Sequence, residues 1–111
     1  RGAMILPSAT INIDSTIGEH AILNTSCSID HDCRIGDFVH VAPGCVLGGS
    51  VVVGEGAFLG IGVSVIPGIR IGRWSIVGAG SVVTKEIPDN CTAVGVPARV
   101  IKTREEGWHL G

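Results

Sequence analysis

Histidines are the residues of this chain best suited to moving a proton near neutral pH. The chain contains four of them, and only His31 lies directly between two carboxylates, Asp30 and Asp32. A neighbouring carboxylate can orient an imidazole ring and stabilise the imidazolium formed when the ring accepts a proton. The pattern therefore predicts His31 as a general base with Asp32 as its partner. A solvated polar corner is the alternative, and His20 and His109 are interpreted as surface residues.

The elements that must position His31 follow from a repeat of six residues. Every sixth residue from Ile5 to Val83 is aliphatic, and the residue four places later is always small or aliphatic. Glycine follows the aliphatic residue in half of the hexads. A period of six fits neither a helix nor a single two-sided strand. The fourteen aliphatic positions are Ile5, Ile11, Ile17, Leu23, Ile29, Ile35, Val41, Leu47, Val53, Leu59, Val65, Ile71, Val77 and Val83.

A triangular prism satisfies this period. Each hexad supplies one short strand and one corner, so three hexads complete a coil of 18 residues. The large aliphatic and the small residue point inward, and coils stack through parallel ladders about 4.8 Å apart. The sequence predicts an all-β fold, a left-handed parallel β-helix of about five triangular coils with a short C-terminal cap. A right-handed β-helix is the alternative, but its coils are longer and less regular.

The predicted organisation has three parts. Residues 1–4 are interpreted as an expression remnant and residues 5–88 as the β-helix domain. The period ends at the turn cluster Pro88-Asp89-Asn90, and residues 89–111 are expected to form a capping segment and a tail.

Composition excludes several function classes. The formal net charge is −2, which argues against a general affinity for nucleic acid. No apolar run approaches the roughly 20 residues that cross a bilayer. The four cysteines lack a CxxC pair and zinc-type spacing, so they are interpreted as reduced core residues of a cytoplasmic protein, with no metal site.

Several segments of the repeat resemble a known family. They are Asn24-Thr25, Ile29-Asp30-His31-Asp32-Cys33, Ile35-Gly36-Asp37-Phe38-Val39-His40-Val41-Ala42-Pro43-Gly44, Gly60-Ile61-Gly62, Val65-Ile66-Pro67-Gly68, Gly78-Ala79-Gly80-Ser81-Val82-Val83 and Val94-Gly95-Val96-Pro97-Ala98. The chain is similar to hexapeptide-repeat acyltransferases of the sialic-acid O-acetyltransferase type. That group includes bacterial enzymes that N-acetylate UDP-4-amino-4,6-dideoxy sugars. The resemblance implies acetyl-CoA as co-substrate and a sugar or nucleotide sugar as acceptor.

The resemblance also assigns roles to residues. His31 matches the catalytic base of the group, and Asp32 takes the place of the acidic residue that follows it. Asn24 matches a residue near the acceptor amine. Gly62, Pro67 and Gly80 lie in segments similar to those along the CoA path.

Gly49 is a candidate from both the period and the resemblance. One coil separates residue 49 from residue 31, so Gly48-Gly49 should leave bare backbone N–H groups beside His31. A glycine N–H at this offset points at the thioester carbonyl in the resembling enzymes. We therefore expect Gly49 to bind the oxyanion, with a relaxed corner as the alternative.

Three further residues are expected to act at interfaces or on phosphates. A lone column leaves apolar surface on its flat faces, so the chain is expected to form a homotrimer with sites between columns. His40 should then line the site or bind the acetyl carbonyl. Arg99 and Lys102 belong to the basic second half of the chain and are expected to meet the CoA phosphates, with a solvated tail as the alternative.

Different functions on the same fold are also compatible with parts of the sequence. A γ-type carbonic anhydrase shares the fold but needs three zinc histidines, a set that His31 and His40 do not make. A non-catalytic β-helical scaffold and an acetyltransferase with a non-sugar acceptor both stay open. The resembling group usually carries an N-terminal α/β domain that binds the nucleotide sugar. Nothing in this sequence corresponds to it, so a truncated or minimal variant is expected.

Overall fold

The repeating unit of the structure is a two-residue strand followed by a tight corner. The structure is a computed structural model that describes residues 2–111. The repeat strands are β1 (Met4–Ile5), β2 (Thr10–Ile11), β3 (Thr16–Ile17), β4 (Ile22–Leu23), β5 (Ser28–Ile29), β6 (Arg34–Ile35), β7 (His40–Val41), β8 (Val46–Leu47), β9 (Val52–Val53), β10 (Phe58–Leu59), β11 (Ser64–Val65), β12 (Arg70–Ile71), β13 (Ile76–Val77) and β14 (Val82–Val83). They are followed by β15 (Cys91–Val94), β16 (Arg99–Thr103) and a 3-10 helix η1 (Trp108–Leu110).

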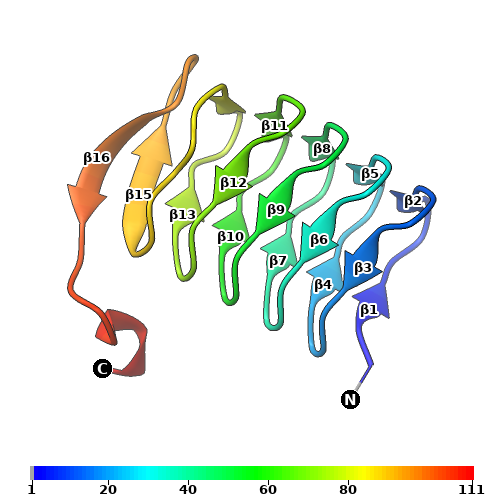
Figure 1. The fold of residues 1–111 in the computed structure, drawn as a ribbon, viewed down its shortest axis with the longest axis horizontal. Coiled ribbons are helices and arrows are strands. Elements are labelled where there is room, and N and C mark those ends of the chain that lie inside the picture. Colours follow the sequence, from blue (N-terminus) through cyan, green and yellow to red (C-terminus); the bar gives the residue numbers. More distant parts are fainter. Residues whose placement is uncertain (1) are drawn as a thin grey trace.

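Three sheets form the faces of a triangular column. Face 1 is the sheet β1-β4-β7-β10-β13-β15-β16, face 2 is β2-β5-β8-β11-β14, and face 3 is β3-β6-β9-β12. Neighbouring strands of the repeat are parallel and 18 residues apart, as in the pairing of Ile29 with Leu47. Figure 1 shows the coils stacked side by side along one axis. The predicted left-handed parallel β-helix of about five coils is confirmed.

The corners of successive coils stack into three edges. The 1/2 edge joins faces 1 and 2 and contains residues 24–27, 42–45, 60–63 and 78–81. The 2/3 edge contains residues 12–15, 30–33, 48–51 and 66–69. The 3/1 edge contains residues 18–21, 36–39, 54–57 and 72–75. Each edge faces solvent, so a residue type placed there repeats along the column once per coil.

The core is the inside of the column. Of the fourteen predicted inward aliphatics, the eleven from Leu23 to Val83 are buried. Ile5 is 51% exposed, and Ile11 and Ile17 are only half-buried. Full burial was therefore wrong for the first coil, because each coil buries its residues against neighbours on both sides and these three have a coil of the described chain on one side only.

The C-terminal segment closes the opposite end of the column. Strand β15 pairs in parallel with β13, and β16 returns antiparallel along β15. The tail then reaches the 3/1 edge, where the His109 ring stacks on Trp74 with centroids 3.5 Å apart. On the other side of the indole lies Gly56, where a Cβ would overlap the ring. The interpretation of His109 as a surface residue was wrong, because this stack half-buries it.

Two ends of the predicted organisation can be placed on the structure. Arg1 lies outside the described residues, whereas Met4 already pairs with Ile22 in face 1. At the other end, Ile87 makes the last isolated bridge, to Ile71, before β15 begins. Within residues 2–111, no helix has the length and apolar character needed to cross a membrane.

Candidate active site

His31 and Asp32 form a pair at the 2/3 edge, in the corner between β5 and β6. The His31 Nδ1 atom lies 3.1 Å from Asp32 Oδ2. The side chains are 55% and 58% exposed, so the pair faces solvent. Asp32 adopts a left-handed backbone conformation with φ of 58°, which aspartate tolerates better than most residues. With Nδ1 donating to Asp32, the lone pair of the ring is at Nε2, on the side away from the carboxylate.

The backbone of this corner is bonded to the coils on both sides. The Asp32 N–H donates to the Ile13 carbonyl at 3.1 Å, and the Ser50 N–H donates to the His31 carbonyl at 2.9 Å. The His31 N–H donates to Asp30 Oδ1 at 2.7 Å. The main chain that carries the imidazole is therefore fixed by three hydrogen bonds.

Gly49 lies against the His31 ring in the next coil. A Cβ at residue 49 would lie 2.7 Å from both Cε1 and Nε2 of His31, closer than real side chains approach. The glycine is thus needed for space, since its φ is not in the left-handed region. Its N–H makes no hydrogen bond within residues 2–111, although the residue is buried. The structure therefore places an unused backbone donor beside the imidazole.

Pro67 continues the same edge one coil beyond Gly49. A Cβ at Gly48 would lie 2.7 Å from the Pro67 N atom, so the two corners are in close contact. The 2/3 edge thus presents His31, Gly49 and Pro67 in successive coils.

Asn24, Gly62 and Gly80 lie on a different edge, the 1/2 edge. Asn24 Oδ1 accepts the Thr25 N–H at 2.7 Å. Gly62 and Gly80 have φ of 71° and 74°, and a Cβ at either would meet nothing within 4 Å. This edge is a strip of open backbone, separated from the His31 edge by the width of face 2. One chain therefore does not bring Asn24, Gly62 or Gly80 to His31.

The remaining predicted site residues are also apart from His31. His40 lies on face 1, opposite the 2/3 edge, where its half-buried ring packs edge-on against Phe58 with centroids 5.1 Å apart. Arg99 and Lys102 are exposed on β16 at the C-terminal end of the column. Sequence reasoning located these residues by coil number, but it did not show how far the three faces separate them.

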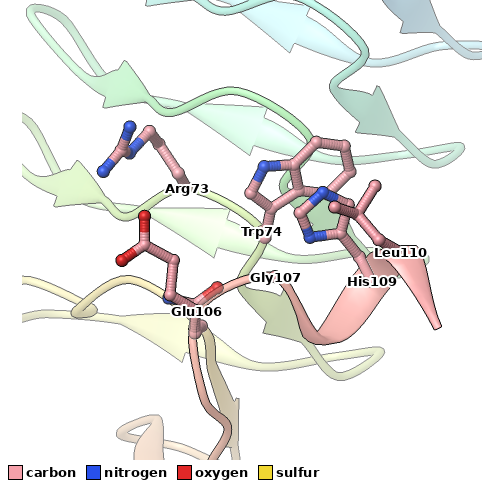
Figure 2. Close-up of a pocket in the computed structure, with 7 residues that line it drawn as sticks. Arg73, Trp74, Glu106, Gly107, His109 and Leu110 are labelled. Atoms are coloured by element: carbon pink, nitrogen blue, oxygen red, sulfur yellow. The ribbon is translucent and has the colours of Figure 1, made fainter.

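A small cavity of about 190 Å³ lies elsewhere, at the 3/1 edge under the C-terminal tail. Figure 2 shows Trp74 and His109 stacked at one side of it and Arg73 and Glu106 at the other. None of the predicted site residues lines it. Its lining residues are Arg73, Trp74, Asn90, Glu106, Gly107, His109 and Leu110.

Thiol and metal chemistry find little support in the described part of the chain. All four cysteines are buried and unpaired, and burial raises the pKa of the Cys45 thiol to about 11. A thiol protonated at neutral pH is a poor nucleophile. Across residues 2–111, no three His, Cys, Asp or Glu side chains gather in a way that would hold a metal ion. His31 is therefore the group best placed for proton transfer.

The stacked hexads and the His31 corner are features of a hexapeptide-repeat transferase. The chain belongs to the bacterial transferase hexapeptide (six repeats) family, which matches residues 14–49 and 50–85. It is 40% identical over 107 residues to GDP-perosamine N-acetyltransferase of Escherichia coli O157:H7, covering 91% of this chain and 48% of that protein. It is 36% identical over 112 residues to serine acetyltransferase of Bacillus pumilus, covering 90% of this chain and 48% of that protein.

A solved structure shares the fold closely. A histidine-to-alanine mutant of GDP-perosamine N-acetyltransferase from Caulobacter crescentus, in complex with CoA and GDP-perosamine, superposes with a TM-score of 0.85 at 44% identity. The match covers 89% of this chain and 53% of that chain. The chain thus spans about half the length of these relatives.

Proposed function

We propose that this chain is the acetyl-transferring part of an acetyl-CoA-dependent acetyltransferase whose acceptor is an amino or hydroxyl group of a sugar or nucleotide sugar. The observation that carries the proposal is the His31–Asp32 pair seated on Gly49 at a solvent-open edge. Relatives named as perosamine N-acetyltransferase and galactoside O-acetyltransferase support a sugar acceptor.

The chemistry assigned to the corner is a general-base acyl transfer. His31 Nε2 takes the proton of the acceptor amine or hydroxyl as that group attacks the thioester carbonyl. Asp32 stabilises the imidazolium through Nδ1. The Gly49 N–H donates to the oxygen that becomes negative in the tetrahedral intermediate. His31 then returns the proton to the departing sulfur, which gives the acetylated acceptor and the free thiol of CoA.

The complete site is proposed to form between protomers of a homotrimer. The site residues of the repeat lie on or near the two edges that border face 2. The outward side chains of face 2 are mostly small, and they are Thr10, Ser28, Val46, Ser64 and Val82. Small side chains let three columns approach closely around a three-fold axis. This packing brings the 2/3 edge of one protomer beside the 1/2 edge of the next.

Such an arrangement assembles what one chain keeps apart. His31, Asp32, Gly49 and Pro67 would come from one protomer, and Asn24, His40, Gly62 and Gly80 from its neighbour. The open glycine backbone of the 1/2 edge suits a path for the pantetheine arm of CoA. Arg99 and Lys102, exposed at the C-terminal end, are proposed to attract the CoA phosphates. The four unpaired cysteines fit a cytoplasmic location.

The test is product formation with a small panel of acceptors. The chain is incubated with acetyl-CoA and GDP-perosamine, a galactoside or L-serine, and thiol release and product mass are followed. Acetylation of the perosamine amine or of a galactoside hydroxyl supports the proposal. Acetylation of serine alone would contradict the sugar acceptor. Binding of acetyl-CoA with no transfer to any member would favour a non-catalytic scaffold.

A further inference from the structure

A chain of hydrogen bonds runs beneath His31 and is not part of the chemistry assigned above. We propose that Asp30, held by Asn12 from the preceding coil, is a positioning residue that fixes the place of the His31 imidazole. This inference rests on the proposed function, because it gives Asp30 a role in a reaction in which His31 is the base.

The carboxylate of Asp30 joins two coils at the 2/3 edge. Its Oδ1 accepts the His31 N–H at 2.7 Å and the Asn12 Nδ2 group at 3.2 Å. Asn12 is itself fixed, because its Oδ1 accepts the Ile13 N–H at 3.0 Å. The Asp30 side chain is therefore oriented from the coil below before it binds the backbone of His31.

The far side of the same corner is held by Ser15. Its Oγ donates to the Asp30 carbonyl at 2.7 Å and accepts the Cys33 N–H at 3.0 Å. Asp30 is thus bonded through its carboxylate at the start of the corner and through its carbonyl by a half-buried hydroxyl. Side chains of the preceding coil determine where this corner stands.

His31 needs this support because little else surrounds its ring. The side chain is 55% exposed, and its described contacts are Asp32 at Nδ1 and the bare backbone of Gly49. Both contacts depend on where the His31 backbone lies. Misplacement of a catalytic group by about 1 Å can lower a rate by about 100-fold. Loss of the Asp30 hydrogen bond should therefore loosen the pair of His31 and Asp32.

The variants separate a hydrogen bond from a charge. Asp30→Ala removes the acceptor of the His31 N–H, whereas Asp30→Asn keeps an oxygen acceptor and removes the charge. We expect Asp30→Ala to lower kcat by roughly 10- to 100-fold with the KM for acetyl-CoA unchanged. Asp30→Asn should stay within about threefold of the wild type and keep its pH profile, because the positioning bond survives.

Asp37→Ala is the matched control. Asp37 Oδ1 accepts the Glu19 N–H at 2.8 Å across one coil, which is the same kind of bond at the 3/1 edge. Its loss should affect stability as Asp30→Ala does but leave kcat unchanged. Equal losses of kcat in the two alanine variants would overturn the inference, because the effect would then be general destabilisation.

The decisive measurement is nitrogen-15 NMR of the His31 ring in the full chain, with kinetics on GDP-perosamine beside it. We expect one predominant tautomer, protonated at Nδ1, in the wild type and in Asp30→Asn, and averaging toward both tautomers in Asp30→Ala. In the double variant with His31→Ala, Asp30→Ala should cost no further rate. Unchanged ring signals in Asp30→Ala, or an impaired Asp30→Asn, would overturn the inference. Absence of acetyl transfer in the wild type would instead refute the proposed function and leave the NMR result to decide on Asp30.

Discussion

At the scale of single residues, the His31 corner depends on a side chain that is absent. The imidazole occupies the space where a Cβ of residue 49 would be, and the unused N–H of Gly49 lies beside it. An exposed base and a buried donor therefore share one small volume in neighbouring coils. This closeness is what makes a general-base acyl transfer geometrically reasonable here.

Gly49→Ala should damage activity without unfolding the chain. The new methyl group would push the His31 ring from its seat and crowd the N–H that is proposed to bind the oxyanion. We expect kcat to fall by roughly 100-fold or more, as for loss of an oxyanion donor. Steady-state kinetics and thermal melting check this. Gly68→Ala, at an open corner of the same edge, is a control for the cost of a methyl group, and equal effects on kcat would contradict the assignment.

The residues of this corner were predictable because the period is strict. With 18 residues per coil, position 49 must follow position 31 on the same edge, and the structure shows this contact. The positions of Asn24 and His40 relative to His31 were not predictable from one chain, because they lie across the column and meet His31 only if protomers associate. His109 was misjudged because the tail after Lys102 has no period from which a contact can be read.

At the scale of elements, the C-terminal tail is fastened to the column by aromatic contacts. Trp74 lies between Gly56 and His109, and Arg104 lies 4.5 Å from the centroid of the Trp108 ring. The Arg104 Nη1 group also donates to Thr92 Oγ1 at 2.7 Å. The tail therefore covers the last coils instead of extending into solvent.

Trp74→Ala should release this tail. The variant removes the His109 stack and the indole surface over Gly56, and we expect a loss of roughly 1–3 kcal/mol, less than for a fully buried tryptophan. Urea unfolding measures the loss, and hydrogen exchange should show weaker protection over residues 104–111. Trp74→Phe, which keeps an aromatic ring, should lose less. Unchanged exchange in Trp74→Ala would contradict the role of the stack.

Asp89 should make the stability of the last turn depend on pH. Burial raises its pKa, but the Arg73 backbone N–H and the guanidiniums of Arg70 and Arg73 outweigh that effect and hold the pKa below its usual value. A carboxylate with a lowered pKa stabilises the fold above its unfolded pKa, and this stability is lost as the pH falls through the folded pKa. The wild type should therefore melt above Asp89→Asn at neutral pH.

The difference should disappear as the pH drops below about 4. Asparagine keeps an oxygen that can accept the Arg73 N–H, so the comparison isolates the charge. Melting curves from pH 3 to pH 7 test this expectation. A difference that is constant over that range would show that the charge of Asp89 does not stabilise the turn.

At the scale of the whole molecule, the fold follows from the repeat, but its ends do not. The hexads specify which residues point inward and how coils stack, and burial agrees from Leu23 to Val83. The first coil is less buried than the period predicts, and the hairpin of β15 and β16 leaves the period altogether. Repetition determines the contacts between coils, whereas the ends depend on contacts that occur once.

Association through face 2 can be tested with one bulky substitution. Ser64→Trp places a large side chain on the outward surface of β11, where three columns are proposed to meet, and should lower the trimer fraction strongly. Val52→Trp on face 3 is the control and should leave the trimer intact. Sedimentation equilibrium at micromolar concentration measures both. A monomeric wild type, or a trimeric Ser64→Trp, would contradict packing through face 2.

The central claim, that His31 is the base of an acetyl transfer, is tested most directly by the kinetics of His31→Ala. The side chain is exposed, so the variant should lose well under about 1 kcal/mol of stability and bind acetyl-CoA as before. With GDP-perosamine as acceptor, we predict a fall in kcat of roughly 10²- to 10⁴-fold. His20→Ala, at the 3/1 edge, should retain wild-type kcat. A His31→Ala variant that retains near-normal kcat would contradict the account.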